Sequence, residues 1–174
     1  MRIDIDARVR PMVVGDVAHL EFIRDGSADA IWSSHMLEHL FEHDCRRALK
    51  DFVRVLKPSG YVLIHTPDLQ KVAHAIVDRG LDQPLYDSPA GTVYPLDTIF
   101  GMRSSIERGN GFMAHRTGFS LERLGTMLLD AGFREARVWD GSMYDLWAVG
   151  LREAAEMKGQ DQPNPNPQGR DGIG

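Results

Sequence analysis

Apolar and polar positions alternate along the first 80 residues in a way that predicts short strands followed by helices. Strands are predicted over 2–6, 12–17, 29–34 and 61–67, and helices over 44–57 and 69–80. The run YVLIHTP at 61–67 is almost wholly apolar and ends in proline, which is typical of a buried parallel strand. The first helix has apolar residues at helical spacing with Asp44 as the expected N-cap, and Gly80 ends the second.

The second half of the chain is patterned less regularly before it returns to clear elements. Residues 81–119 read as turns and a polar loop, with a short helix within 96–106, and a loop of this length is usually functional or mobile. A helix is predicted over 120–133, capped by Ser120 and ended by Gly132. A hairpin follows around Gly141.

Strands that alternate with helices and finish in a hairpin predict an α/β fold. We expect a Rossmann-like three-layer sandwich with a mostly parallel sheet that ends in an antiparallel hairpin. Residues 1–152 form one domain in this interpretation. Residues 153–174 are rich in Pro, Gly and Gln, so we expect a disordered tail there.

Composition excludes several classes of protein. The net charge of −5 argues against a nucleic-acid binder, which would need clustered Lys and Arg. No apolar run approaches the length of a membrane span, and no signal peptide opens the chain, so no membrane association is expected. The single cysteine, Cys45, excludes an internal disulfide, and a cytoplasmic location is predicted.

Polar residues follow several of the predicted strands. The carboxyl ends of parallel strands meet at one edge of a sheet, and ligands bind at that edge in open α/β folds. The residues placed there are Asp4, Asp6, Asp16, Ser33, Ser34, His35, His65 and Thr66.

The segment SSHMLEHL contains His35-x-x-Glu38-His39, a spacing found in zinc hydrolases. A metal-dependent hydrolase with Glu38 as base is therefore one open alternative. However, the strand at 29–34 runs directly into His35, so we expect this histidine at a strand end and not on a helix. No third ligand stands out, since ordinary explanations suffice for the other candidates, which are His65, His74 and His115. We predict no bound metal, and we expect His39 to hydrogen-bond a neighbouring backbone group.

The segment DAIWSSHMLEHL…ALKDFVRVLKPSGYVLIHTPDL resembles the middle of class I S-adenosylmethionine-dependent methyltransferases of the type 11 group. The later TGFSLERLGTMLLDAGF resembles the helix before the closing hairpin of that family. The resemblance implies that Asp4, or its competitor Asp6, meets the ribose hydroxyls of S-adenosylmethionine. It implies that Asp16 and the Val17 backbone meet the adenine. The residues beneath the methionine half would be Ser33, Ser34 and His35.

The family normally begins one strand and one helix earlier, with a glycine-rich turn, and no G-x-G motif precedes the strand at 2–6. The sequence is compatible with a fragment, a shortened relative or a non-catalytic remnant, and a fragment is the expectation. Only residues 7–11 join the first two predicted strands, whereas a parallel crossover needs at least about ten residues. We therefore expect one of these strands to be poorly formed, or the two not to form a crossover pair.

The function that the resemblance implies is methyl transfer from S-adenosylmethionine to the oxygen or nitrogen of a small-molecule acceptor. Histidine suits removal of the acceptor's proton near neutral pH, and the candidates are His35 and His115. His115 and Arg116 are also suited to an anionic acceptor. A partner-binding remnant that uses an exposed sheet edge is the alternative from another class. A homodimer is compatible with either interpretation.

Overall fold

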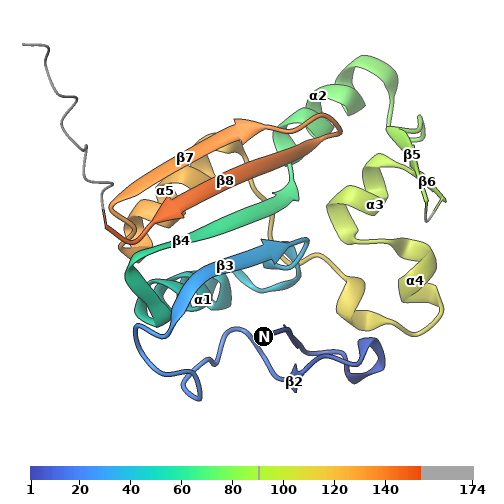
Figure 1. Ribbon diagram of the computed structural model, residues 1–174. Coiled ribbons are helices and arrows are strands. Elements are labelled where there is room, and N and C mark those ends of the chain that lie inside the picture. Colours follow the sequence, from blue (N-terminus) through green and yellow to red (C-terminus); the bar gives the residue numbers. More distant parts are fainter. Residues whose placement is uncertain (90, 154–174) are drawn as a thin grey trace, which may run out of the picture.

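The computed structural model describes residues 1–89 and 91–153 (Figure 1). The predicted disordered tail therefore lies outside the described residues from 154 onward. Among the helices of the described part, none has the length and apolarity needed to cross a membrane.

Short strands and helices alternate along the chain. The strands are β1 (Ile3–Asp4), β2 (Val13–Val14), β3 (Ala28–Ser34), β4 (Leu56–Pro67), β5 (Tyr86–Ser88), β6 (Gly91–Val93), β7 (Glu135–Asp140) and β8 (Asp145–Leu151). The α-helices are α1 (Glu42–Val55), α2 (Leu69–Arg79), α3 (Pro95–Phe100), α4 (Arg103–Glu107) and α5 (Leu121–Ala131). The 3-10 helices are η1 (Ala7–Val9), η2 (Leu37–His39) and η3 (Gly111–Met113).

The main sheet has the strand order β3-β4-β8-β7 (Figure 1). β3 and β4 are parallel, and their register pairs Ser34 with His65 at the carboxyl ends. β8 runs antiparallel to both β4 and β7, which confirms the predicted closing hairpin. The register aligns the polar ends of β3 and β4, so their side chains belong to one edge of the sheet.

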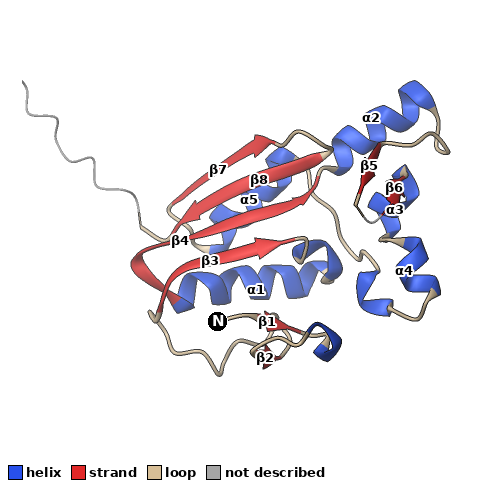
Figure 2. Cartoon of the chain, turned by 45° about the vertical axis from the view of Figure 1, so that its right-hand side comes forward, coloured by secondary structure: helices blue, strands red, loops and turns tan. Residues whose placement is uncertain are grey.

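Helices α1 and α5 cover one face of this sheet (Figure 2). Their apolar faces and the sheet bury a common core that includes Leu49, Phe52, Ile64, Leu128 and Leu146. The Rossmann-like α/β fold is thereby confirmed. The described main sheet is not mostly parallel as predicted, since only β3 and β4 are parallel and the other two pairs are antiparallel. Of the three expected layers, the described residues form two.

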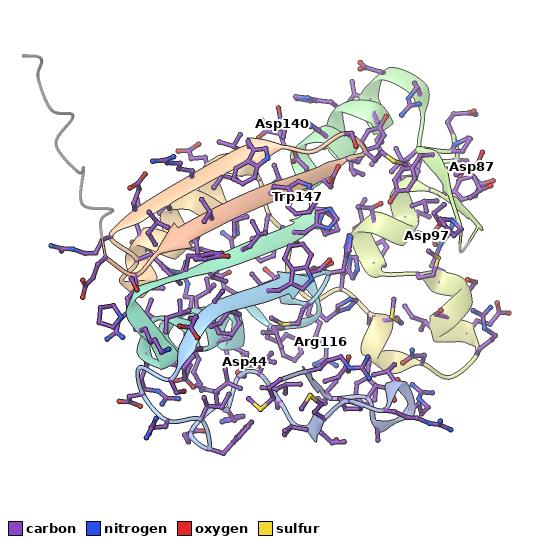
Figure 3. All side chains as sticks on the ribbon, viewed as in Figure 1. Asp44, Asp87, Asp97, Arg116, Asp140 and Trp147 are labelled. Carbon is purple, nitrogen blue, oxygen red and sulfur yellow. The ribbon has the colours of Figure 1, made fainter. Side chains whose placement is uncertain are left out.

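The opposite face of the sheet carries aromatic side chains and no covering helix among the described residues. Figure 3 shows Trp147 on this face. Trp32, Tyr61 and Trp139 are 57%, 45% and 45% exposed. Trp32 and Trp147 lie with ring centroids 5.5 Å apart, so the open face is partly covered by its own aromatic rings.

The first two strands form a separate parallel pair beyond β3 in Figures 1 and 2. Each has only two residues, and η1 lies within the link between them. The short link therefore permits a parallel pair because the strands themselves are short. The predicted spans 2–6 and 12–17 were too long. Within the described residues, no strand pairs with the outer edge of β3.

Two further elements differ from the sequence-based prediction. The first helix begins at Glu42 after Phe41, and not after Asp44. Asp44 instead lies in the first turn, where a carboxylate favours the positive end of the helix dipole. Between α2 and α5 the chain forms a β5-β6 hairpin and two short helices, because Gly101 interrupts the predicted helix at 96–106 with φ +94°.

Asp97 holds the first turn of α3 together. Its carboxylate is 8% exposed and accepts hydrogen bonds from the Tyr94 backbone (3.0 Å) and the Arg103 guanidinium (2.8 Å). Burial acts to raise the pKa of Asp97, but these hydrogen bonds outweigh it and the pKa lies below its ordinary value. Helix α3 matters for the site because a carbonyl of its last turn holds His115.

We expect Asp97→Asn to lower the free energy of unfolding by about 1–3 kcal/mol at neutral pH, because the buried carboxylate loses its charge-assisted bonds. Because the pKa of Asp97 is lower in the folded protein than in the unfolded chain, the carboxylate stabilises the fold above the unfolded-state pKa of 3.8. This stabilisation is lost as the pH falls through the folded-state pKa. The difference between variant and wild type should therefore shrink below about pH 4. Urea denaturation at a series of pH values measures it. Asp87→Asn, at an exposed position in the β5-β6 hairpin, is the control.

Candidate active site

The carboxyl end of β3 turns sharply at His35. This residue has φ +46°, a left-handed conformation that is uncommon outside glycine and that often marks functional turns. Its backbone N–H donates to the carbonyl of His65 at 2.9 Å, which holds the turn against the end of β4. The side chain of His35 is 51% exposed and therefore accessible to a ligand.

Glu38, in η2, is a carboxylate buried beneath this turn and is only 2% exposed. Its two oxygens contact the Nδ1 of His35 (3.2 Å) and the hydroxyl of Thr66, which donates at 3.1 Å. Burial acts to raise the pKa of Glu38, but the hydrogen bond from His35 and the charges of nearby histidines outweigh it and the pKa is lowered. The pKa of His35 is raised in turn, chiefly by its hydrogen bond to Glu38.

His65 forms a second polar group at the end of β4. Its Nε2 lies 2.9 Å from the carboxylate of Asp145, and its Nδ1 lies 3.3 Å from the hydroxyl of Ser34. The ring stacks on Trp147 at 4.4 Å and meets the edge of His35 at the same separation. Burial acts to raise the pKa of Asp145, but hydrogen bonds from the Met143 backbone and His65 lower it overall.

The segment after η3 closes over the turn from the other side. The backbone N–H groups of Arg116 and Thr117 both donate to the carbonyl of Glu38, at 2.8 and 3.3 Å. These bonds place His115 against His39, with ring centroids 4.8 Å apart. Burial lowers the pKa of His115. The structure thus brings both predicted catalytic histidines, His35 and His115, to the same turn.

His39 hydrogen-bonds a backbone group as predicted, but one that is distant in the sequence. Its Nδ1 lies 3.2 Å from the carbonyl of Ala114, in the segment that also carries His115. The partner could not be named from the sequence, because it comes from a distant loop.

The predicted nucleoside-binding acids lie at the ends of β1 and β2. Asp4 is half-buried, and its Oδ1 accepts from the Asp6 backbone at 2.9 Å. Asp6 itself is bound by Arg8 through both carboxylate oxygens, so Asp4 is the less occupied of the two competitors. Asp16 is half-buried beside Val17 and accepts from the Ala18 backbone at 2.9 Å.

The two serines at the end of β3 point to opposite faces of the sheet. Ser33 is 4% exposed and pairs in register with the core residue Ile64, so its side chain faces the helices. Its hydroxyl is buried with no hydrogen-bond partner among the described residues. Ser34 lies on the open face with His65. Both serines therefore contribute backbone to the turn, but only the side chain of Ser34 lies on the open face of the sheet.

From the sequence, His65 and Thr66 were placed at the ligand-binding edge without a role, Glu38 was named only as the base of the metal alternative, and Asp145 was not identified. Glu38 carried a signal in the H-x-x-E-H spacing, and His65-Thr66 carried one in their strand-end position. Asp145 carried none, because its approach depends on the antiparallel register of β8 against β4. Two surface hollows lie away from this site. One of about 250 Å³ is lined by residues between Thr92 and Glu107, and one of about 370 Å³ lies between α2 and the β7–β8 turn. Neither is lined by a predicted site residue.

Comparison with known proteins agrees with this geometry. A family profile described as a methyltransferase domain matches residues 3–64. No curated protein sequence matches the chain. The fold is similar to a SAM-dependent methyltransferase from Thermotoga maritima, with 20% identity and a TM-score of 0.52, over 84% of this chain and 67% of that one. A SAM-dependent methyltransferase from Archaeoglobus fulgidus is 15% identical with a TM-score of 0.53, over 86% of this chain and 74% of that one. A protein from Pyrococcus horikoshii OT3 is 16% identical with a TM-score of 0.53, over 86% of this chain and 69% of that one.

The chain spans about two thirds to three quarters of the length of these three structures. S-adenosylmethionine is the cofactor of the family, and the donor groups of its adenosine half fit the residues present. Ribose hydroxyls and an adenine amino group donate hydrogen bonds, and the half-buried carboxylates of Asp4 and Asp16 can accept them. Residues 3–64 thus match a methyltransferase domain, and the β3-β4-β8-β7 sheet has a fold similar to that of S-adenosylmethionine-dependent methyltransferases.

Proposed function

We propose that this protein transfers a methyl group from S-adenosylmethionine to an oxygen or nitrogen of a small-molecule acceptor. The observation that carries the proposal is the pair of His35 and Glu38 at the carboxyl end of β3. An exposed imidazole held by a buried carboxylate is an arrangement suited to proton removal, and it lies at the edge where ligands bind in this fold.

The bound cofactor supplies an electrophilic methyl group, so the protein has to position the acceptor and accept its proton. Glu38 accepts a hydrogen bond from Nδ1 of His35, which leaves Nε2 of that ring as the site for an incoming proton. The hydrogen bond to Glu38 also favours the protonated ring that would result. His35 is therefore the proposed base.

The cofactor in this proposal is held at the ends of β1, β2 and β3. Asp4 accepts from the ribose hydroxyls, and Asp16 with the Val17 backbone accepts from and donates to the adenine. The turn of Ser33, Ser34 and His35 supports the methionine half. His115 and Arg116 form the other wall of the acceptor site, and a cytoplasmic location remains the expectation.

Isothermal titration with S-adenosylhomocysteine, the demethylated product, tests the proposal. We expect saturable binding, and we expect Asp16→Asn to weaken it at least about tenfold, because a charge-assisted hydrogen bond contributes about 1.5–3 kcal/mol. Asp78→Asn, an exposed position on α2, is the matched control and should leave the affinity unchanged. Product formation against a panel of hydroxyl and amine acceptors is then measured with the same sample.

Absence of binding in a folded, monodisperse sample would overturn the proposal. Equal weakening by the two asparagine variants would reject the assignment of Asp16 to the adenine site. Binding without turnover on any acceptor would favour the alternative of a non-catalytic relative.

A further inference from the structure

Three potential metal ligands meet beneath the turn that follows β3. One ligand atom from each of Glu38, His39 and His115 lies within 4.8 Å of the other two. The first two residues belong to η2, and the third comes from the segment after η3. No metal was expected from the sequence, because no third ligand stood out beside His35 and His39. In the structure His115 joins His39 and Glu38, and His35 is not one of the three.

Hydrogen bonds to backbone carbonyls fix the orientation of both histidine rings. Nδ1 of His39 lies 3.2 Å from the carbonyl of Ala114, and Nδ1 of His115 lies 2.8 Å from the carbonyl of Thr98. A carbonyl only accepts hydrogen bonds, so each Nδ1 carries the hydrogen. In the neutral rings the lone pair is then on Nε2. Metal-binding histidines usually have their second nitrogen held in this way.

Within residues 1–89 and 91–153, no hydrogen-bond donor contacts either Nε2 atom. The rings of His39 and His115 meet edge to face, with centroids 4.8 Å apart and an interplanar angle of 72°. Both rings are half-buried, and one nitrogen of each ring lies within 4.8 Å of the other and of a carboxylate oxygen of Glu38. A cation between them would be coordinated by two imidazole nitrogens and one carboxylate oxygen.

Glu38 provides negative charge where a cation needs it. Its carboxylate is 2% exposed and accepts from Thr66 and contacts His35, yet a carboxylate offers about four lone-pair positions. One oxygen can therefore hold its hydrogen bond and a metal ion together. Burial in surroundings of low polarity strengthens the attraction between the carboxylate and a divalent ion.

We propose that Glu38, His39 and His115 bind one divalent transition-metal ion, of which Zn²⁺ and Co²⁺ are representative. Two imidazoles and one carboxylate suit such ions, whereas Mg²⁺ and Ca²⁺ prefer oxygen ligands. Tetrahedral coordination at about 2.1 Å places ligand atoms about 3.4 Å apart. The three side chains therefore close by about an ångström when the ion binds.

The consequence for the reaction rests on the proposed function. Three protein ligands leave coordination positions for an acceptor oxygen, and a bound cation lowers the pKa of a hydroxyl. His35, whose Nδ1 contacts the same carboxylate, would take up the proton of that hydroxyl on its Nε2. The substrate class is therefore a hydroxyl compound, and methylation occurs at oxygen.

Titration of the tag-free protein with Co²⁺, followed by visible absorption, tests the site without any methyl acceptor. We expect one equivalent of Co²⁺ to give the absorption of a nitrogen-coordinated ion, and Zn²⁺ to displace it. His115→Ala and Glu38→Gln should each weaken binding at least about tenfold. His43→Ala removes an exposed histidine of α1 and should change nothing, so it is the matched control.

Far-UV circular dichroism establishes that each variant is folded, and His39→Ala replaces Glu38→Gln if the buried substitution prevents folding. Failure to bind Co²⁺ or Zn²⁺ stoichiometrically overturns the proposal, and so does an equal loss in His43→Ala and His115→Ala. Binding of S-adenosylhomocysteine is measured separately. Metal binding without it would support this site while rejecting the proposed function, and the reverse result would reject this site alone.

Discussion

Gly101→Ala is expected to destabilise the protein by about 3 kcal/mol or more and to release the segment that carries His115. Gly101 ends α3 with φ +94° and ψ 163°, a region of backbone conformation that is nearly restricted to glycine. A Cβ atom here would overlap the carbonyl oxygen of Met113 and lie 3.0 Å from the Cα of Ala114. The obstacle is backbone, which cannot rotate away as a side chain would, so the segment after η3 has to move.

Gly109→Ala separates the two causes of that effect. Gly109 also has a positive φ, +87°, but a Cβ there would meet nothing within 4 Å. Its cost should stay near the roughly 1 kcal/mol of backbone strain. Urea denaturation gives the free energy of unfolding of both variants, and limited trypsin digestion measures exposure of the bond after Arg116. Equal losses of stability, or unchanged cleavage after Arg116 in Gly101→Ala, would contradict the prediction.

Much of the central fold could be predicted from the sequence because local signals agree with tertiary contacts there. The parallel strand at 61–67 is part of β4, and α5 has the predicted Ser120 and Gly132 caps. The hairpin of β7 and β8 was also predicted, since alternation on both sides of Gly141 has only one compact solution. These elements depend on residues close in sequence, which is where periodicity and capping are informative.

The first strands and the region between α2 and α5 were predicted less well, for a different physical reason. The length of a strand depends on its pairing partner, and β1 and β2 pair only with each other over two residues. The hairpin of β5 and β6 has no strong alternation. Its formation depends on tertiary packing, which the alternation of apolar and polar residues along the sequence does not reveal.

The strand-end residues of the site were predicted from the sequence, but the contacts between segments distant in the sequence were not. The end of β3 was identified because a polar turn follows an apolar run. The contact between His39 and His115 depends on the bonds from Arg116 and Thr117 to the Glu38 carbonyl. No local pattern encodes such bonds, so the sequence could not distinguish a half-buried His115 that packs on His39 from an exposed loop histidine.

Phe119 is where the core and the site segment join, and its substitution is expected to have the largest effect on stability. The side chain is 1% exposed within the main core. Its carbonyl accepts from the Leu69 backbone at 2.9 Å, and it forms an isolated parallel bridge with Asp68, directly after β4. The ring thus anchors the chain between His115 and α5 against the start of α2.

Phe119→Ala should lower the free energy of unfolding by about 3–5 kcal/mol, the usual cost of emptying a buried aromatic site. Such a loss is a large part of the 5–15 kcal/mol typical of a domain, so Phe119→Leu, with an expected loss of about 1.5 kcal/mol or less, provides a variant that still folds. Phe112→Ala is the matched control, because Phe112 is 45% exposed and should cost less than about 1 kcal/mol. Urea denaturation followed by far-UV circular dichroism, with unchanged m-values, measures all three. Similar midpoints for the Phe119→Ala and Phe112→Ala proteins would show that the segment is not held by the core, and the position of His115 would then have to depend on its hydrogen bonds alone.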